Sequence, residues 1–406
     1  TASSSLSDLS DYILQEKLGS GSFGKVYKIK EKNTNIFYAA KISIEELNED
    51  TYDLFMTISC EVNIISRFNH PSVLKFILYS PINFKKKPKP VIITEYASNG
   101  SLLRSIEHDR QFPDNPILND TRKLIIIYGI ASAMSYLHSN EIIHRDLKTD
   151  NVLLDDFLFP KVADFGLSKS SAPIQHSVYI QTKADTIKGT PLYIAPEIWQ
   201  QSLYSKFGDV YAFSIVVYEI MTCQRPFSDI DIFTLGISVK KGQRPKFNVD
   251  VPGAYKYLIE RCWSQHPENR PTFDQILTEL RTDRSYITEK INEEEYFNYI
   301  KLIDDYKTTF DSTKVVVPYS NFSKYKIIWG IMNNNIQFGD FNENIKLINL
   351  IGIFPYKYIK YLSDESIKLV LEAKDDHQLQ FEVGRNLIEG RYDFPIDLKI
   401  GLNFIN

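Results

Sequence analysis

The sequence predicts an α+β fold with two lobes, the first built on an antiparallel β-sheet and the second mainly α-helical. From Tyr12 onward, apolar and polar residues alternate on both sides of several glycines, a pattern typical of half-buried strands joined by turns. After Asn99 and Gly100 the apolar residues recur at helical spacing. We therefore expect a sheet lobe over residues 12–98, a helical lobe over residues 99–282, and a further helical region after them.

Residues 1–11 are expected to be a flexible lead-in to the first lobe. The piece TASSSLSDLS is rich in serine and has no aromatic residue, so it offers little apolar surface for burial. Its serines are potential phosphorylation sites. A solvated tail is the simpler interpretation.

A glycine-rich hairpin opens the first lobe. The motif GSGSFG at residues 19–24 lies between two alternating runs, and a third strand follows a turn at residues 32–35. In a dinucleotide-binding fold such glycines open a helix, with an acidic residue about 20 positions later. Here residues 25–29 continue a strand. The pattern therefore favours a hairpin whose glycines let backbone amides approach a ligand closely.

Lys41 at the end of the third strand is followed by an apolar helix that carries Glu61. The helix segment ISCEVNIISRF, residues 58–68, has apolar residues along one face. A lone lysine on a strand is most often solvated, so Lys41 gains interest only from its combination with Glu61. The acidic run at residues 45–50 between them is interpreted as a solvated loop and not as a metal site.

The octet HRDLKTDN, residues 144–151, is the richest concentration of reactive groups in the chain. It holds an imidazole, a guanidinium, a carboxylate, an ammonium and a carboxamide. A segment with helical periodicity precedes it and the short apolar run VLLD follows it. We therefore expect a loop between buried elements, where reactive groups are held rigidly yet remain accessible.

This octet closely resembles the catalytic loop of protein kinases. The glycine-rich hairpin, the strand lysine, the helix glutamate, a DFG triplet at residues 164–166 and the motif GTPLYIAPE resemble kinase motifs in the same order. Lys148, two residues after Asp146, is typical of Ser/Thr-specific kinases, in which Thr190 would bridge these two residues. The DVYAF and RPTF motifs resemble the tyrosine-kinase-like group of Ser/Thr kinases. The resemblance covers residues 12–282.

The resemblance implies a set of catalytic and metal-binding residues. Asp146 would accept or orient the proton of the substrate hydroxyl, Asn151 and Asp164 would bind Mg²⁺, and Glu61 would hold Lys41 against the α- and β-phosphates of ATP. Phosphoryl transfer mainly requires positioning of charged oxygens and neutralisation of charge. The implied catalytic residues are Asp146, Lys148, Lys41, Glu61 and Thr190.

An ATP site between the lobes is also implied by the resemblance. Thr94 would lie at the back of the adenine pocket, residues 95–97 would form the hinge, and Val26 would cover the adenine. The residues expected to contact the nucleotide are Gly19, Ser20, Gly21, Ser22, Phe23, Gly24, Val26, Ala39, Lys41, Thr94, Glu95, Tyr96, Ala97 and Leu153.

Residues 164–197 resemble an activation loop. The segment is polar and contains several hydroxyl groups. A phosphate on it would pair with the guanidinium of Arg145 and order the loop. We expect Thr186 to be that site, with Thr182 as the second candidate, although hydroxyls in polar loops often resemble phosphorylation sites.

Three further residues are implied to support this site from the helical lobe. Asp209, near the start of a strongly apolar helix, would anchor the backbone of the catalytic loop. Arg270 would form a buried ion pair with Glu197 of the APE triplet. Their role would be to hold the loops in place.

Residues 283–406 are expected to form a helical C-terminal region. The segment at residues 289–310 has apolar residues at helical spacing. The last piece resembles one SEL-one-like helical repeat, in which Gly384 and Gly390 permit close packing, Pro395 and Asp397 begin the second helix, and residues 402–405 continue it. One hypothesis is a truncated repeat array that continues beyond Asn406 and binds a protein partner. The other is a helical extension that packs on the kinase.

Bulk composition limits the other function classes. The chain has 406 residues, 43% hydrophobic and 24% charged, with a net charge of -4, which argues against a dominant nucleic-acid or acidic-membrane interaction. No apolar run has the length of a membrane span. Cys60, Cys223 and Cys262 are odd in number and far apart, which favours a reducing compartment. We expect a cytoplasmic protein.

The sequence therefore predicts an ATP- and Mg²⁺-dependent protein serine/threonine kinase that acts on protein substrates in intracellular signalling. One alternative is a nucleotide-binding pseudokinase, a class that usually lacks at least one of the residues named above. The other is a helical-repeat scaffold or adaptor in which kinase activity is incidental.

Overall fold

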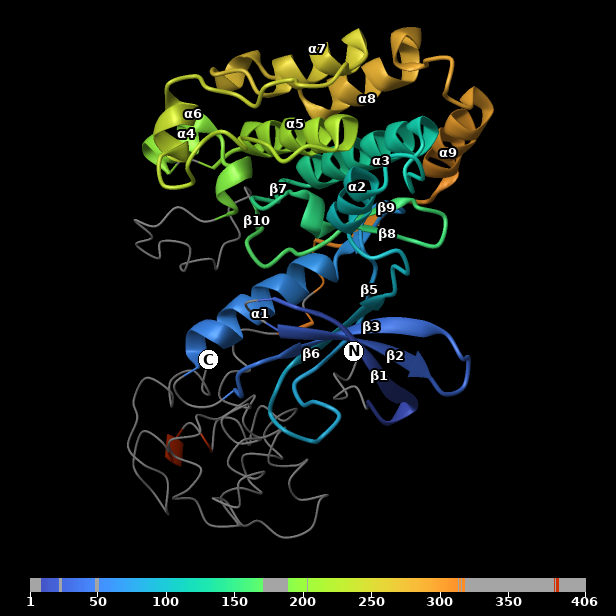
Figure 1. Cartoon of the computed structure of the whole chain (residues 1–406). Coiled ribbons are helices and arrows are strands. Elements are labelled where there is room, and N and C mark those ends of the chain that lie inside the picture. The colour runs from blue at the N-terminus through green and yellow to red at the C-terminus, as the bar shows by residue number, and fades with distance from the viewer. Residues whose placement is uncertain are drawn as a thin grey trace.

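The computed structural model describes residues 9–21, 24–47, 51–170, 189–202, 204–312, 314, 316–317, 383 and 385–386. Within them the chain folds into two lobes, a twisted sheet crossed by one helix and a larger helical body (Figure 1). The α+β fold with two lobes is confirmed. The residues of the repeat resemblance, Gly384, Gly390, Pro395, Asp397 and 402–405, lie outside the described part. No helix in that part is long and apolar enough to cross a bilayer.

The N-terminal lobe is a five-stranded antiparallel sheet in the order β1-β2-β3-β6-β5. Its strands are β1 (Tyr12–Ser20), β2 (Gly24–Glu31), β3 (Phe37–Ser43), β5 (Phe76–Ser80) and β6 (Val91–Glu95). On β6 the side chain of Ile92 packs under helix α1 (Tyr52–Ile65), whereas Val91 and Ile93 pack on the other face with Leu9. This alternation follows from the two-residue period of a strand. The buried Leu9 belongs to a short 3-10 turn, Leu9–Asp11, just before the predicted start at Tyr12.

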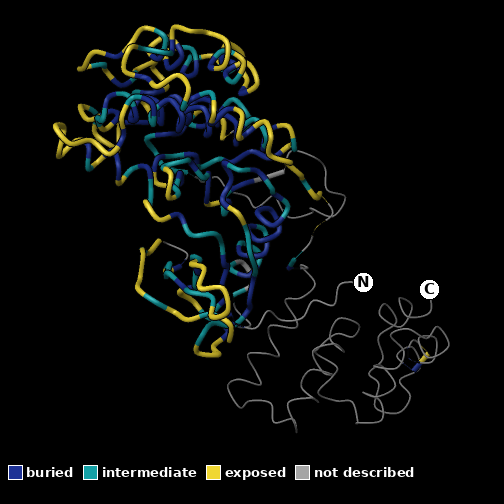
Figure 2. The backbone as a smooth tube through the Cα atoms, turned by 90° about the vertical axis from the view of Figure 1, so that its right-hand side faces the viewer, coloured by how far each residue is buried: buried dark blue, intermediate teal, exposed yellow. Residues whose placement is uncertain are grey.

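The C-terminal lobe is built around two helices that are buried on nearly all sides, α3 (Asp120–Ser139) and α5 (Lys206–Thr222). Helices that are apolar all round are expected in the centre of a core, and Figure 2 shows this part of the backbone as the most buried. The surrounding helices are α2 (Leu102–Gln111), α4 (Pro196–Gln201), α6 (Leu235–Lys240), α7 (Gly253–Cys262) and α8 (Phe273–Thr282).

Short strands at the border of the lobes position the loops of the site. The octet at residues 144–151 lies between β7 (Ile142–Ile143) and β8 (Val152–Leu154), as a loop between two buried elements. Strand β8 pairs with β9 (Pro160–Val162), and β7 pairs with β10 (Lys169–Ser170). The DFG triplet at residues 164–166 follows β9, so both loops emerge side by side.

Helix α9 (Glu293–Asp305) lies beyond the predicted end of the kinase domain and packs against α3. Its Tyr299 is buried, and its hydroxyl lies 3.1 Å from that of Ser72. A Cβ at Gly129 of α3 would come within 2.3 Å of this hydroxyl, so α9 needs a glycine at that position. The chain then forms β11 (Thr309–Phe310), which pairs with β4 (Phe68–Asn69). The predicted domain border at residue 282 stays a prediction.

Candidate active site

The carboxylate of Asp146 is the centre of a hydrogen-bonded cluster. Its Oδ1 accepts hydrogen bonds from the backbone N–H and from Oγ1 of Thr190, at 3.1 and 3.0 Å. Its Oδ2 lies 3.2 Å from Lys148 Nζ and accepts a bond of 3.0 Å from Asn151 Nδ2. Lys148 Nζ also donates to Thr190 Oγ1 at 2.8 Å. The structure thus brings together four of the residues expected at the site.

Asp209 fixes the backbone of the same loop from within the helical lobe. Its carboxylate is buried and accepts bonds from the N–H groups of His144 and Arg145, at 2.8 and 2.9 Å. His138 Nε2 lies 2.9 Å from the same carboxylate. Burial by itself would raise the pKa of Asp209, but the hydrogen bond to His138 and the neighbouring donors hold the pKa below its usual value. His138 was not predicted from the sequence, because one histidine in a helix carries no local signal.

Lys41 on β3 lies between two carboxylates. Its Nζ is 2.6 Å from Glu61 Oε1 on α1 and 3.8 Å from Asp164 Oδ1. Burial alone would lower the pKa of Lys41, but the charges of Glu61 and Asp164 outweigh burial and raise the pKa. The lysine is therefore a cation at neutral pH, placed between the sheet and the DFG triplet, where it can neutralise phosphate oxygens.

Phe165 of the DFG triplet connects the two lobes by ring packing. Its side chain is fully buried, with its ring centroid 5.2 Å from that of His144 and 5.0 Å from that of Phe68. His144 in turn lies with Nε2 3.1 Å from the carbonyl oxygen of Ala163. The position of Asp164 next to Phe165 is therefore tied both to the catalytic loop and to the chain just after α1.

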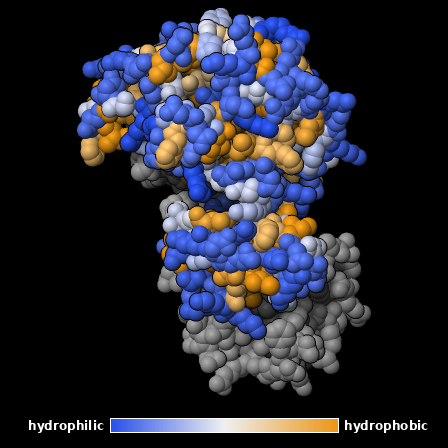
Figure 3. All heavy atoms as spheres, turned by 45° about the vertical axis from the view of Figure 1, so that its right-hand side comes forward, coloured by the Kyte–Doolittle hydropathy of each residue, from blue (hydrophilic) through white to orange (hydrophobic). Residues whose placement is uncertain are grey.

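The nucleotide-binding residues expected from the sequence line the border between the lobes. Ala39 pairs with Thr94 across β3 and β6, which brings the expected pocket wall and its back position side by side. A Cβ at Gly24 would lie 2.8 Å from the carbonyl oxygen of Ile42, so only glycine fits there, whereas Gly19 and Gly21 face open space. Figure 3 shows the surface hollowed between the lobes.

The other expected nucleotide contacts are distributed around the same border. Ser20 ends β1, Val26 lies on β2 opposite Lys41, and Leu153 lies on β8. The hinge follows β6, with Glu95 paired to Lys161 at 3.3 Å and Ala97 buried. Ser22 and Phe23 lie outside the described residues.

Asn151 and Asp164 offer a carboxamide and a carboxylate at neighbouring loop positions. The backbone N–H of Ala163 donates to the carbonyl oxygen of Asn151 at 2.8 Å, which holds the residue before Asp164 against the catalytic loop. The side chain of Asp164 is 43% exposed, so it is open to the space between the lobes. Oxygen ligands of this kind fit Mg²⁺, which takes one or two carboxylates and completes its shell with phosphates and water. The described residues contain no group of three His, Cys, Asp or Glu that could hold a metal alone.

Arg145 directly precedes Asp146 and lies against an aromatic ring. Its guanidinium lies over the ring of Tyr204, 4.8 Å from the centroid, and its buried Nε has no hydrogen-bond partner in the described part of the chain. Burial lowers the pKa of Arg145. The expected loop phosphorylation sites Thr186 and Thr182 lie outside the described residues.

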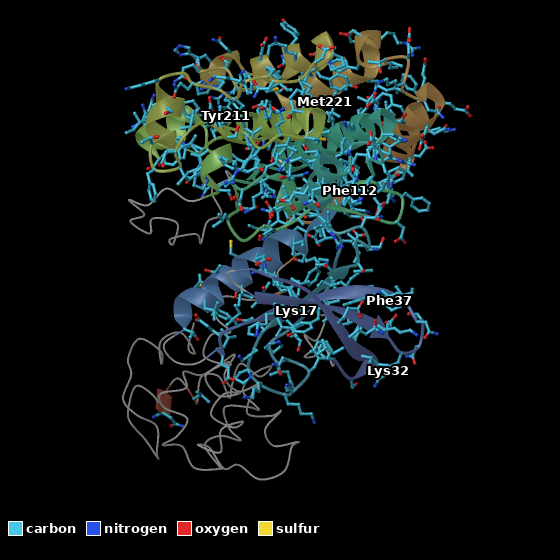
Figure 4. All side chains as sticks on the ribbon, viewed as in Figure 1. Lys17, Lys32, Phe37, Phe112, Tyr211 and Met221 are labelled. Carbon is cyan, nitrogen blue, oxygen red and sulfur yellow. The ribbon has the colours of Figure 1, made fainter. Side chains whose placement is uncertain are left out.

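Two buried networks in the helical lobe support the site. Arg270 and Glu197 form a double ion pair with both distances at 2.8 Å. Arg270 also lies over the ring of Tyr211, 5.3 Å from the centroid. Figure 4 labels Tyr211 within the helical lobe. The second network joins Glu219 to the hydroxyl of Tyr193.

In this second network Glu219 of α5 accepts a bond of 2.5 Å from Tyr193 and lies 3.3 Å from Thr149 Oγ1. Burial raises the pKa of Glu219 to about 7. This network was not predicted from the sequence, because Thr149 and Tyr193 are 44 positions apart and Tyr193 and Glu219 are 26 positions apart.

These groups are suited to position and neutralise charged oxygens, which is the main requirement of phosphoryl transfer. The fold and site therefore define a nucleotide-dependent phosphotransferase with two lobes. Residues 12–280 match the family described as protein tyrosine and serine/threonine kinase. The chain belongs to this family.

Relatives within the family carry serine/threonine kinase names. The chain is 33% identical over 267 residues to a serine/threonine-protein kinase/receptor of Acanthamoeba polyphaga mimivirus, covering 65% of this chain and 15% of that protein. It is 32% identical over 281 residues to the serine/threonine-protein kinase CTR1 of Arabidopsis thaliana, covering 67% and 31%. It is 33% identical over 279 residues to the serine/threonine/tyrosine-protein kinase HT1 of Arabidopsis thaliana, covering 67% and 66%. Predicted membership of the protein kinases, on the Ser/Thr side, is confirmed.

Proposed function

We propose that this chain is an active serine/threonine kinase that transfers the γ-phosphoryl group of ATP to hydroxyl groups of protein substrates. The observation that carries the proposal is that both halves of the site are assembled at once. Lys41 contacts Glu61 at 2.6 Å while Asp146 is held by Thr190, Lys148 and Asn151. A pseudokinase would be expected to lack at least one of these groups.

In the proposed reaction the substrate hydroxyl oxygen forms a bond to the γ-phosphorus of ATP. The bond from that phosphorus to the oxygen bridging the β-phosphate breaks, ADP leaves, and the hydroxyl proton passes to Asp146. Thr190 and Lys148 keep the Asp146 carboxylate in place, and Lys41 neutralises charge on the α- and β-phosphates. Asn151 and Asp164 would hold Mg²⁺, which supplies further charge neutralisation when bound.

Serine and threonine are the proposed acceptors because Lys148 stands two residues after Asp146 and contacts Thr190. The printed name of HT1 includes tyrosine, so tyrosine phosphorylation is a specific second outcome to examine.

A phosphate on Thr186 is proposed to pair with Arg145. A cytoplasmic location is proposed from the three free cysteines. Protein partners of the C-terminal region are likewise a proposal.

The test is phosphorylation of a generic basic protein with MgATP by the full chain, followed by mapping of the modified residues. Wild type should produce phosphoserine and phosphothreonine, and the matched surface variant Lys240→Gln should do so at the wild-type rate. Asp146→Asn should lose nearly all of the signal. Equal signal from Asp146→Asn and wild type would contradict the proposal. Loss of autophosphorylation-dependent activity in Thr182→Ala but not in Thr186→Ala would move the regulatory site to Thr182.

A further inference from the structure

A segment beyond the kinase motifs packs along helix α1. After α9 the chain runs back towards the N-terminal lobe, where its orange trace reaches the blue helix in Figure 1. We call the described residues 306–312, 314 and 316–317 the tail segment. They lie outside the match to the kinase family, which ends at residue 280, and no catalytic motif includes them.

The first part of the tail segment, strand β11, pairs with the short strand β4 that follows α1. Thr309 pairs with Asn69 and Phe310 with Phe68. The ring of Phe310 stacks on that of Phe68, with centroids 5.9 Å apart. The ring of Phe68 also contacts that of Phe165 in the DFG triplet, with centroids 5.0 Å apart. The tail segment is therefore one ring away from the DFG triplet.

The second part is bound by the side chain of Asn63. Its Nδ2 donates to the carbonyl oxygen of Val317 at 2.8 Å, and its Oδ1 accepts from the N–H groups of Val316 and Val317 at 2.9 and 2.8 Å. Asn63 is 3% exposed and Val317 is 1% exposed. A buried carboxamide satisfied by three bonds to one short stretch of backbone fixes that stretch closely against the helix.

The apolar side chain of Val317 completes the attachment. It packs in a buried cluster with residues from α1, from the sheet and from the loop after β3, namely Phe55, Ile58, Val62, Tyr79, Ile92 and Leu47. Arg67 adds two hydrogen bonds. Its Nε donates to the carbonyl oxygen of Lys314 at 3.1 Å, and the carbonyl oxygen of Arg67 accepts from the N–H of Asp311 at 3.1 Å. The tail segment thus contacts α1 through its buried face and through the residues that follow it.

Asn63 and Glu61 lie on nearly opposite sides of α1, because two residues turn a helix by about 200°. Glu61 reaches across to Lys41 on one side, and Asn63 holds the tail segment on the other. We infer that the tail segment positions helix α1 for catalysis, with Asn63 as the positioning residue that keeps Glu61 within reach of Lys41. The effect on activity rests on the proposed kinase function, whereas the effect on α1 does not.

The physical reason is a difference in binding between two positions of the helix. The three bonds to Asn63 and the burial of Val317 form only when α1 lies in its present place. A segment that binds one position and not the other shifts the population towards the position it binds. Loss of these contacts should therefore lower the population in which Lys41 and Glu61 are paired, without altering the catalytic loop.

The test uses Asn63→Ala and Val317→Ala in the full chain, with Lys314→Ala as the matched control, because Lys314 contributes only its backbone to the contacts. Both kinase turnover and the rate of alkylation of the three cysteines by iodoacetamide are measured. Cys60 adjoins Glu61 on α1 and is half-buried, Cys223 is half-buried in the helical lobe, and Cys262 is buried. A displaced α1 changes Cys60 alone, whereas a general loss of folding changes all three.

Both tail variants should lower kcat about tenfold and raise Cys60 alkylation about tenfold, with Cys223 and Cys262 unchanged. Lys314→Ala should behave as wild type. Unchanged Cys60 reactivity in both variants would overturn the inference, and so would an equal rise at all three cysteines, because the tail segment would then support the fold in general. An inactive wild type with selective exposure of Cys60 would contradict the kinase proposal and leave the inference supported.

Discussion

The catalytic loop and helix α1 are held in different ways. Asp209 holds the loop by bonds to two backbone N–H groups, and Asp209 itself lies in α5, at the centre of the helical lobe. Helix α1 packs on the sheet through apolar side chains, and its Glu61 forms an ion pair with Lys41 of β3. On the other side of α1, Asn63 binds a segment far along the chain, with a separation of 254 positions between Asn63 and Val317.

This difference indicates that the catalytic loop has a fixed geometry and that helix α1 can change its position. A loop anchored by buried groups of its own lobe keeps its geometry as long as that lobe is folded. A helix whose charged contact is to a lysine that is 26% exposed, and which a distant segment also binds, can change position while the fold persists. We therefore expect the catalytic loop to be preorganised and the position of α1 to decide activity.

The largest expected effect follows from removal of the loop anchor. Asp209→Ala leaves the N–H groups of His144 and Arg145 without their buried acceptor. We expect turnover to fall at least about a hundredfold through misplacement of Asp146, and the free energy of unfolding to fall by about 3 kcal/mol. Steady-state kinetics and denaturant unfolding measure the two quantities. Wild-type stability in this variant would show that the loop is not held from α5.

A smaller and more selective effect is expected at the helix. Glu61→Gln keeps the size of the side chain but removes the charge that contacts Lys41. Turnover should fall about thirtyfold. The free energy of unfolding should change by less than about 1 kcal/mol, because Lys41 is 26% exposed and the new carboxamide oxygen can still accept from it. Glu141→Gln is the matched control, since it removes the charge facing Lys206 in a solvent-exposed ion pair of the helical lobe. A loss of stability as large as that of Asp209→Ala would remove the distinction between loop and helix.

The smallest effect on turnover is expected at Glu219, whose titration makes the stability of the helical lobe depend on pH. Burial raises the pKa of Glu219 from 4.5 to about 7, so the folded protein binds this proton more tightly than the unfolded chain does. The stabilisation is complete below pH 4.5 and is lost as the pH rises through about 7. Glu219→Gln stays neutral and can still accept from Tyr193. The stability difference between wild type and this variant should change by about 2 kcal/mol between about pH 5 and about pH 8.

Thermal unfolding at several pH values measures this difference. A difference that does not depend on pH would show that Glu219 titrates in the folded protein as it does in the unfolded chain. Turnover should follow this change only weakly, because Glu219 contacts Tyr193 and Thr149 and not Asp146.

The sequence predicted those parts of the site whose residues carry a local motif. Asp146, Lys148 and Asn151 share one octet, and Gly24 lies in a hairpin whose alternating pattern is visible beside it. The two lobes were predictable for the same reason, since strand and helix periods change at one point. The residues that were not predicted act through contacts between distant positions in the sequence. Asn63 looks like an ordinary polar residue on a helix, and no local pattern indicates that it binds the backbone near Val317.

Hydrogen exchange of the full chain without nucleotide distinguishes a preorganised catalytic loop from an adjustable helix α1. The backbone N–H groups of His144 and Arg145, which donate to Asp209, should exchange at least about tenfold more slowly than those in the middle of α1. Addition of an ATP analogue with Mg²⁺ should slow exchange in α1 and leave the two loop groups unchanged. Equal protection of α1 and the catalytic loop before nucleotide is added would contradict the claim that the loop is built in and the helix is adjustable.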